Sequence, residues 1–145
     1  MTHDFFLMDR LVVDLTSSPT DYILHTSIDD DLILYFMDFI KWIPSFNPAK
    51  SEIMTGICYH GVTVIYKDGA IIFNKILNGI ISIFQCAPES FSLTGNDLIE
   101  DGNDYFNNKI ICLKSFILQI INDLIKMTLI IIESNDDLYI LHRGI

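Results

Sequence analysis

Two long apolar stretches, residues 70–86 and 110–132, constrain most strongly how this chain of 145 residues folds. Polar side chains interrupt both at helical intervals, Asn74, Lys75 and Asn78 in the first, and Lys114, Gln119, Asn122, Asp123 and Lys126 in the second. A membrane-spanning helix needs about 20 predominantly apolar residues with few charges. We therefore expect amphipathic helices that share a core and no membrane span, despite a mean hydropathy of +0.38.

The apolar spacing predicts three helices. The first covers residues 28–42, after the S-x-x-D pattern Ser27-Ile-Asp-Asp30, and ends before Pro44. The second runs from Asn74 to about Pro88, and the third covers about 112–128. The following run, residues 129–132, either extends the third helix or begins a buried strand, because periodicity alone does not separate these alternatives.

A β-hairpin is the second structural expectation. Val62–Tyr66 and Ala70–Phe73 are apolar runs that flank Lys67-Asp68-Gly69, and Asp-Gly between such runs is a strong hairpin signal. Shorter strands are expected at residues 10–16, 91–95 and 138–142. The sequence thus predicts one α+β domain, residues 1–145, with a small antiparallel sheet and a central Asp-Gly hairpin packed against three amphipathic helices.

The formal net charge of -10 restricts the partners. A strongly acidic surface repels phosphate backbones and anionic lipid headgroups and attracts basic surfaces. Direct binding of nucleic acid is therefore disfavoured. The cysteines, Cys58, Cys86 and Cys112, are odd in number and lack C-x-x-C spacing, which is typical of a reduced, cytoplasmic protein.

No motif indicates catalysis, a cofactor or a metal. The four histidines, His3, His25, His60 and His142, lack ligand spacing. His142 is expected on a strand, either as a surface residue or as a ligand. Cys58 and His60 share a strand face but lie about 6 to 7 Å apart by the strand rise, too far for a nucleophile and its base. We expect no enzyme; a small enzyme that uses Cys58, His60 or acidic residues in a pocket is the alternative.

One acidic segment contains no base and ends in two aromatic residues. Its charges would speed encounter with a basic partner, and its rings would supply desolvated contact area. Asp68, at the tip of the expected hairpin, is a weaker candidate for the same interface. The predicted partner-binding residues of the segment are Asp97, Glu100, Asp101, Asp104, Tyr105 and Phe106.

Several of these features occur together in a known group of proteins. Tyr66-Lys-Asp-Gly69, Phe91-Ser-Leu-Thr-Gly95 and the terminal Tyr139-Ile-Leu-His-Arg-Gly-Ile145, on a small acidic chain, resemble bacterial immunity proteins of contact-dependent growth inhibition and related polymorphic toxin systems. The resemblance is one of general character over most of the chain. It implies a cytoplasmic toxin inhibitor that binds a cognate toxin domain, commonly a nuclease. A membrane-associated immunity protein against a pore-forming toxin is a further alternative.

Overall fold

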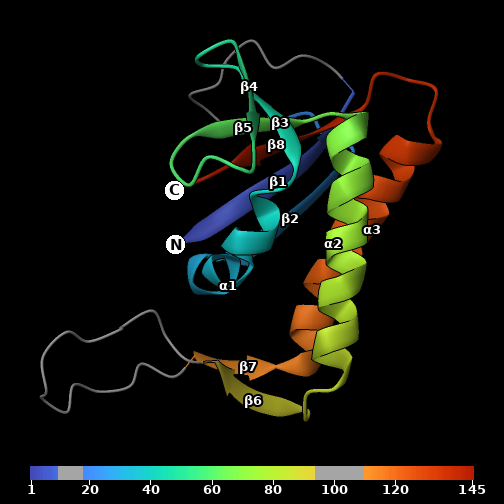
Figure 1. Ribbon diagram of the computed structural model, residues 1–145. Helices are drawn as coiled ribbons and strands as arrows, with labels where there is room; N and C mark the ends of the chain where they lie inside the picture. Colours follow the sequence, from blue (N-terminus) through green and yellow to red (C-terminus); the bar gives the residue numbers. More distant parts are fainter. Residues whose placement is uncertain (10–17, 94–109) are drawn as a thin grey trace, which may run out of the picture.

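The computed structural model describes residues 1–9, 18–93 and 110–145 (Figure 1). These residues form an α+β fold in which three helices pack on an antiparallel sheet of six strands, which confirms the predicted fold class. A separate ribbon of two strands lies at the end of the long helices away from that sheet. In chain order the elements are β1 (Thr2–Met8), β2 (Leu24–Asp29), α1 (Asp30–Ile40), β3 (Pro44–Asn47), β4 (Glu52–Thr55), β5 (Val62–Ile65), α2 (Lys67–Gln85), β6 (Ser90–Leu93), β7 (Ile110–Leu113), α3 (Lys114–Glu133) and β8 (Tyr139–Arg143).

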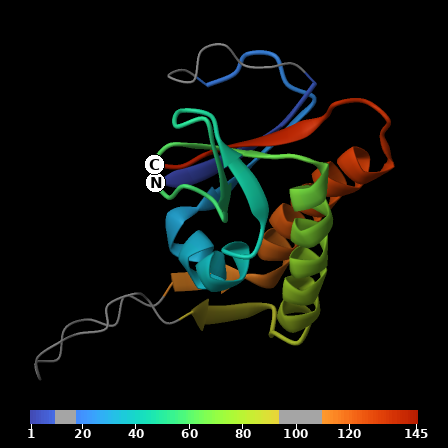
Figure 2. The same cartoon turned by 45° about the horizontal axis from the view of Figure 1, so that its top comes forward.

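The C-terminal strand lies inside the sheet. The strand order is β2-β1-β8-β5-β3-β4, and every neighbouring pair is antiparallel. Ile140 of β8 pairs with Leu7 of β1 on one side and with Ile65 of β5 on the other. The two chain ends therefore lie side by side at one end of these strands (Figure 2).

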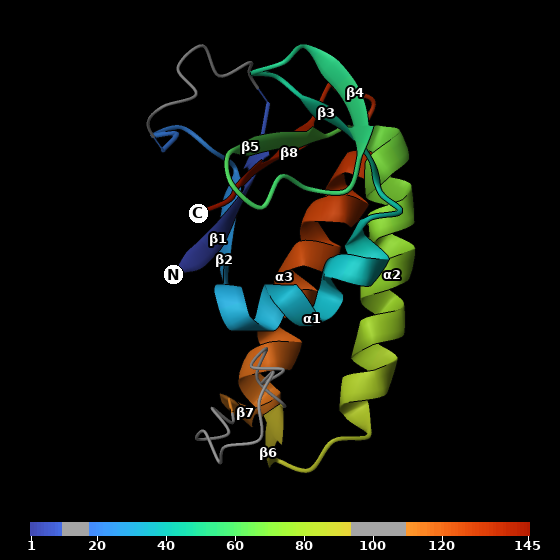
Figure 3. The same ribbon diagram turned by 60° about the vertical axis from the view of Figure 1, so that its left-hand side comes forward.

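The two faces of the sheet carry different apolar clusters, because successive side chains on a strand point to opposite faces. Phe5 and Ile140 face the helices and join a large core that includes Phe73 of α2 and Ile117 of α3. A smaller cluster on the opposite face contains Phe6, Met8, Val64, Tyr139 and Leu141. The helices thus cover one face of the sheet only (Figure 3).

The long helices α2 and α3 run antiparallel, and a lysine from the start of each caps the end of the other. Lys67 Nζ donates to the carbonyl oxygen of Ser134, 2.9 Å away, and Lys114 Nζ donates to that of Gln85, also at 2.9 Å. The last carbonyls of a helix lack partners within the helix and carry partial negative charge. These two hydrogen bonds therefore stabilise both C-terminal ends and fix the antiparallel arrangement.

The predicted Asp-Gly hairpin is wrong. Lys67, Asp68 and Gly69 form the first turn of α2, and Ala70–Phe73 continues this helix instead of returning as a strand. Gly69 is needed for close packing: a Cβ there would overlap the carbonyl oxygen of Pro44 and come within 2.7 Å of the Ile65 side chain. The helical spacing of the apolar residues after Gly69 outweighs the local turn signal.

The other predicted elements are largely confirmed, with shifted ends. The first helix begins at Asp30, with Asp29 as its N-cap accepting from the Asp31 N–H, whereas Ser27 lies in β2. Residues 129–132 extend α3, which settles the alternative left open by the sequence. The strands expected at 91–95 and 138–142 correspond to β6 and β8. The strand expected at 10–16 lies outside the described residues.

Two glycines of α2 are expected to respond in opposite ways to alanine. Gly69→Ala should lower the free energy of unfolding by about 1 to 3 kcal/mol, since the methyl group overlaps backbone that cannot move freely. Gly79→Ala, whose Cβ meets no atom within 4 Å, should raise it by up to about 1 kcal/mol through helix propensity. Urea denaturation measures both. A Gly69→Ala variant as stable as the unchanged protein would contradict the close packing of α2 against β3.

Candidate functional site

A cavity lies where β1 and β5 end and β8 begins. Because β8 is antiparallel to both neighbours, the pairing of Met8 with Tyr139 brings Asp9 toward the residues that precede β8. The pairing of Ile65 with Ile140 likewise places Tyr66 beside Tyr139. The start of α2 and the end of α3 complete the walls. We call this cavity the acidic pocket; it is lined by Asp9, Tyr66, Lys67, Ser134, Asn135, Asp136, Asp137, Leu138 and Tyr139.

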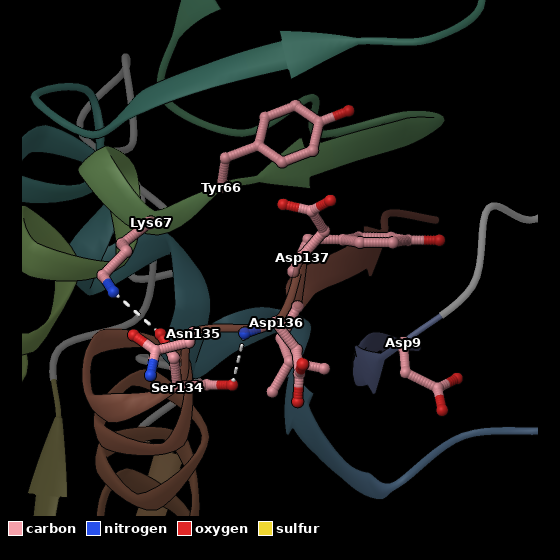
Figure 4. Close-up of a pocket in the computed structure, with 9 residues that line it drawn as sticks. Asp9, Tyr66, Lys67, Ser134, Asn135, Asp136 and Asp137 are labelled. Atoms are coloured by element: carbon pink, nitrogen blue, oxygen red, sulfur yellow. Dashed lines mark hydrogen bonds between the residues drawn. The ribbon is translucent and has the colours of Figure 1, made fainter.

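The acidic pocket measures about 660 Å³ and carries charge on two sides (Figure 4). The Asp137 carboxylate points to the side of Tyr66, whereas those of Asp136 and Asp9 point away from Tyr66. Lys67 is the base in the lining, and its ammonium donates to the carbonyl oxygen of Ser134 at the end of α3. Three carboxylates against one ammonium leave the lining with a net negative charge.

The carboxylates are spread along the wall and do not converge. Within the described residues, no group of three or more His, Cys, Asp or Glu side chains could hold a metal ion. The rings of Tyr66 and Tyr139 lie 6.0 Å apart between centroids. Dispersed carboxylates beside aromatic rings suit ammonium or guanidinium groups, which bind carboxylates and ring faces. The arrangement therefore fits the side chains of a basic surface better than a single ion.

A second polar cluster is buried beneath the helices. Nδ1 of His3 in β1 lies 3.0 Å from Nε2 of His142 in β8, and Nε2 of His3 lies 3.2 Å from Asp30 Oδ1 at the start of α1. The Tyr59 hydroxyl donates to the same carboxylate oxygen at 2.6 Å. Both histidines are fully buried. This chain of hydrogen bonds ties both ends of the protein to α1.

Burial, followed by the proximity of His3, lowers the pKa of His142 to about 3, so this ring is neutral at pH 7. With the ring proton of each histidine on Nε2, His142 donates to His3 Nδ1 and His3 donates to Asp30, a tautomer pair that satisfies both contacts. Nδ1 of His142 has no hydrogen-bond partner among the described residues. The hydrogen bond to Asp30 raises the pKa of Tyr59. Both histidine rings are shielded from solvent, so these side chains form a buried hydrogen-bond network.

A third cluster resembles a hydrolytic triad in composition only. Asp4, His25 and Ser27 lie on the sheet face opposite the helices, and the Ser27 hydroxyl donates to Asp4 Oδ1 at 2.5 Å. His25 Nε2 faces both Asp4 Oδ1, at 3.0 Å, and Ser27 Oγ, at 3.3 Å. A serine hydrolase needs opposite ring nitrogens for these two contacts. The same nitrogen makes both here, so no proton relay is formed.

The predicted site residues have different outcomes. Asp97, Glu100, Asp101, Asp104, Tyr105 and Phe106 lie outside the described residues. Asp68 is exposed in the first turn of α2, next in sequence to Lys67 of the acidic pocket, and not at a hairpin tip. His142 lies on a strand, as expected, but is fully buried, because β8 is internal to the sheet and its face here is covered by α1 and the core.

Cys58 and His60 do not form a reactive pair. They lie in the loop between β4 and β5 and not on a strand. Cys58 Sγ accepts from Asn47 Nδ2 at 3.3 Å, whereas His60 Nδ1 lies 3.2 Å from the carbonyl oxygen of Ile145. No hydrogen bond joins the two side chains in the described part of the chain.

Sequence reasoning missed the acidic pocket. The sequence predicts a turn at Ser134-Asn-Asp-Asp137. The structure has a turn here, in which the Asp136 N–H donates to Ser134 Oγ at 2.9 Å. The available signal was two adjacent carboxylates without a basic neighbour, directly before a strand. Their proximity to Asp9 and Tyr66 depends on strand pairing between distant segments, which the sequence pattern does not reveal.

By length and composition, α3 is the one helix in the described residues that could cross a membrane; 39% of its most apolar window is buried inside the protein. Helices in the core of soluble proteins have the same composition, so this is weak evidence. No protein-family model, curated protein or solved structure matches the chain.

The buried histidine pair predicts a pH-dependent stability. Between pH 6.5 and about 3, the unfolded chain protonates residue 142 and the folded chain does not. Stability is therefore lost as pH falls through this window, by about 1.4 kcal/mol per pH unit for this proton. His142→Phe should therefore reduce the slope of the unfolding free energy against pH by the contribution of about one proton. This change is expected whatever effect the substitution has on stability at neutral pH.

Urea denaturation across roughly pH 4 to 6 measures this slope. His60→Gln is the matched control, because it replaces an exposed histidine that lies outside the buried network. An identical slope in His142→Phe and the unchanged protein would contradict the lowered pKa of His142.

Proposed function

We propose that the protein is an immunity protein that binds a cognate toxin domain and neutralises it through protein–protein contact. The acidic pocket is the observation that carries the proposal. It joins the carboxylates of Asp136, Asp137 and Asp9 to two tyrosine rings in a cavity of about 660 Å³. Arginine and lysine side chains of a partner have the charge and shape that such a lining binds.

A nuclease is the toxin that best fits this chemistry. Its substrate cleft must be basic to hold a phosphate backbone, and a protein with a net charge of -10 is attracted to such a cleft. Long-range attraction speeds the encounter, and rings in the contact supply desolvated area. Inhibition then follows from occupation of the cleft by carboxylates in place of phosphates.

The immunity function predicts that a toxin domain is encoded directly upstream of this chain's gene, and the test uses that domain. Asp137→Lys should slow association by about tenfold at low salt and weaken its salt dependence, since it reverses a charge inside the acidic pocket. Glu52→Lys, on the exposed strand β4, is the matched control with the same change in net charge. Stopped-flow or surface-plasmon measurements give both rates. Equal slowing by the two variants would mean that net charge alone matters and the pocket is not in the interface.

A second arm compares the acidic pocket with the segment predicted from sequence. Reversal of Asp97, Glu100, Asp101 and Asp104 to Lys should slow association if this segment also faces the toxin, and Tyr105→Ala with Phe106→Ala should speed dissociation. An unchanged association rate removes the segment from the interface. The absence of a toxin gene beside this one would contradict the immunity function itself.

A further inference from the structure

An apolar groove lies where the end of α1 meets the middle of α2. It measures about 200 Å³, with Phe39 and Trp42 on one side. The other side, which includes the floor, is formed by five residues of α2: Lys75, Ile76, Gly79, Ile80 and Ile83. The groove does not touch the acidic pocket, because the two share no lining residue.

The walls of the groove expose large apolar side chains to water. Trp42 is 64% exposed, Ile83 66% and Phe39 41%. The rings of Phe39 and Trp42 meet edge to face at 5.7 Å between centroids, so they form one rigid aromatic wall. Tryptophan is enriched among the residues that dominate binding energy in protein interfaces. The fold of the described residues does not require these apolar side chains to be exposed to water.

The floor of the groove contains a glycine that the fold does not need. A Cβ at Gly79 would meet no atom within 4 Å, in contrast to Gly69 of the same helix. Glycine inside a helix is less favourable than alanine by about 1 kcal/mol. Because Gly79 has no side chain, the α2 backbone at this position is accessible to close approach by a partner molecule.

The spacing on α2 indicates the form of the occupant. Lys75, Gly79 and Ile83 are four residues apart and make one straight ridge along the helix. Ridges of this kind pack against those of another helix, with a small residue where the two backbones come closest. A helix laid along α2 would thus cross at Gly79 and pack against Trp42 and Ile83.

Charge indicates the composition of the occupant. Among the residues that line the groove, Lys75 alone is charged, within the part of the chain that the structure describes. A carboxylate on the occupant, one turn from its apolar contact with Gly79, would complement this ammonium. A second copy of this chain is a poor occupant, because each copy has a net charge of -10 and the two repel.

We propose that the apolar groove is a docking site for an amphipathic helix of a partner protein, which places an apolar side chain over Gly79 and a carboxylate beside Lys75. The groove and the acidic pocket are separate surfaces. This proposal therefore stands whether or not the acidic pocket binds a toxin.

The probe is a synthetic alanine-based helical peptide of roughly 20 residues with two leucines four positions apart and a glutamate one turn from them. Trp42 is the single tryptophan of the chain, so its fluorescence reports occupation of the groove directly. We expect a saturable blue shift, and binding about twofold to fivefold weaker when lysine replaces the peptide's glutamate. Lys75→Glu should reverse this preference between the two peptides.

Gly79→Leu fills the floor of the groove and should weaken binding at least about tenfold. Asn78→Leu adds the same side chain at the adjacent position, outside the groove lining, and should bind as the unchanged protein does. Circular dichroism checks that both variants remain folded. Absence of a saturable change, full binding by Gly79→Leu, or an unaltered peptide preference in Lys75→Glu would overturn the proposal. Concentration-dependent dimers that Gly79→Leu abolishes in sedimentation would also overturn it, because they assign the groove to a second copy.

Discussion

The hydrogen bonding of β8 to both β1 and β5 is the interaction on which the rest of the structure depends. It places the last strand of the chain between a strand from the N-terminus and one from the middle. One consequence is a continuous apolar face, with Phe5, Ile65 and Ile140 turned toward the helices. Another is the acidic pocket, which exists only because β1 and β5 end where β8 begins.

The same pairing brings two histidines together inside the protein. His3 and His142 lie 139 positions apart in sequence, yet their rings share a hydrogen bond and continue to Asp30 at the start of α1. A buried polar group is costly unless it is hydrogen-bonded, so the three side chains hold one another in place. The network links the pairing of β1 with β8 to the start of α1, because His3 contacts both His142 and Asp30.

Local patterns in the sequence predicted the helices well and the sheet poorly. The spacing of Ile117, Ile120 and Leu124 is a property of one segment, and α3 appears where this spacing predicts it. The segment that forms β1 has four successive buried residues, Phe5 to Met8, so it lacks the alternation by which half-exposed strands are recognised. Asp68-Gly69 gave a false hairpin because the turn signal is local, whereas Gly69 is required by its contact with Pro44.

The acidic character of the candidate site could be predicted from the sequence, but its position in the fold could not. The net charge of -10 predicted an acidic surface from composition alone, and the basic partner stays a prediction. Asp9, Tyr66 and Asp137 come together through pairings between segments far apart in the chain, which no local pattern encodes. A chemical-shift map of the protein bound to its toxin domain tests most directly whether this pocket receives the partner. We expect the largest shifts at Tyr66, Asp136 and Asp137; a bound complex in which these residues keep their free shifts would contradict the proposed role of the acidic pocket.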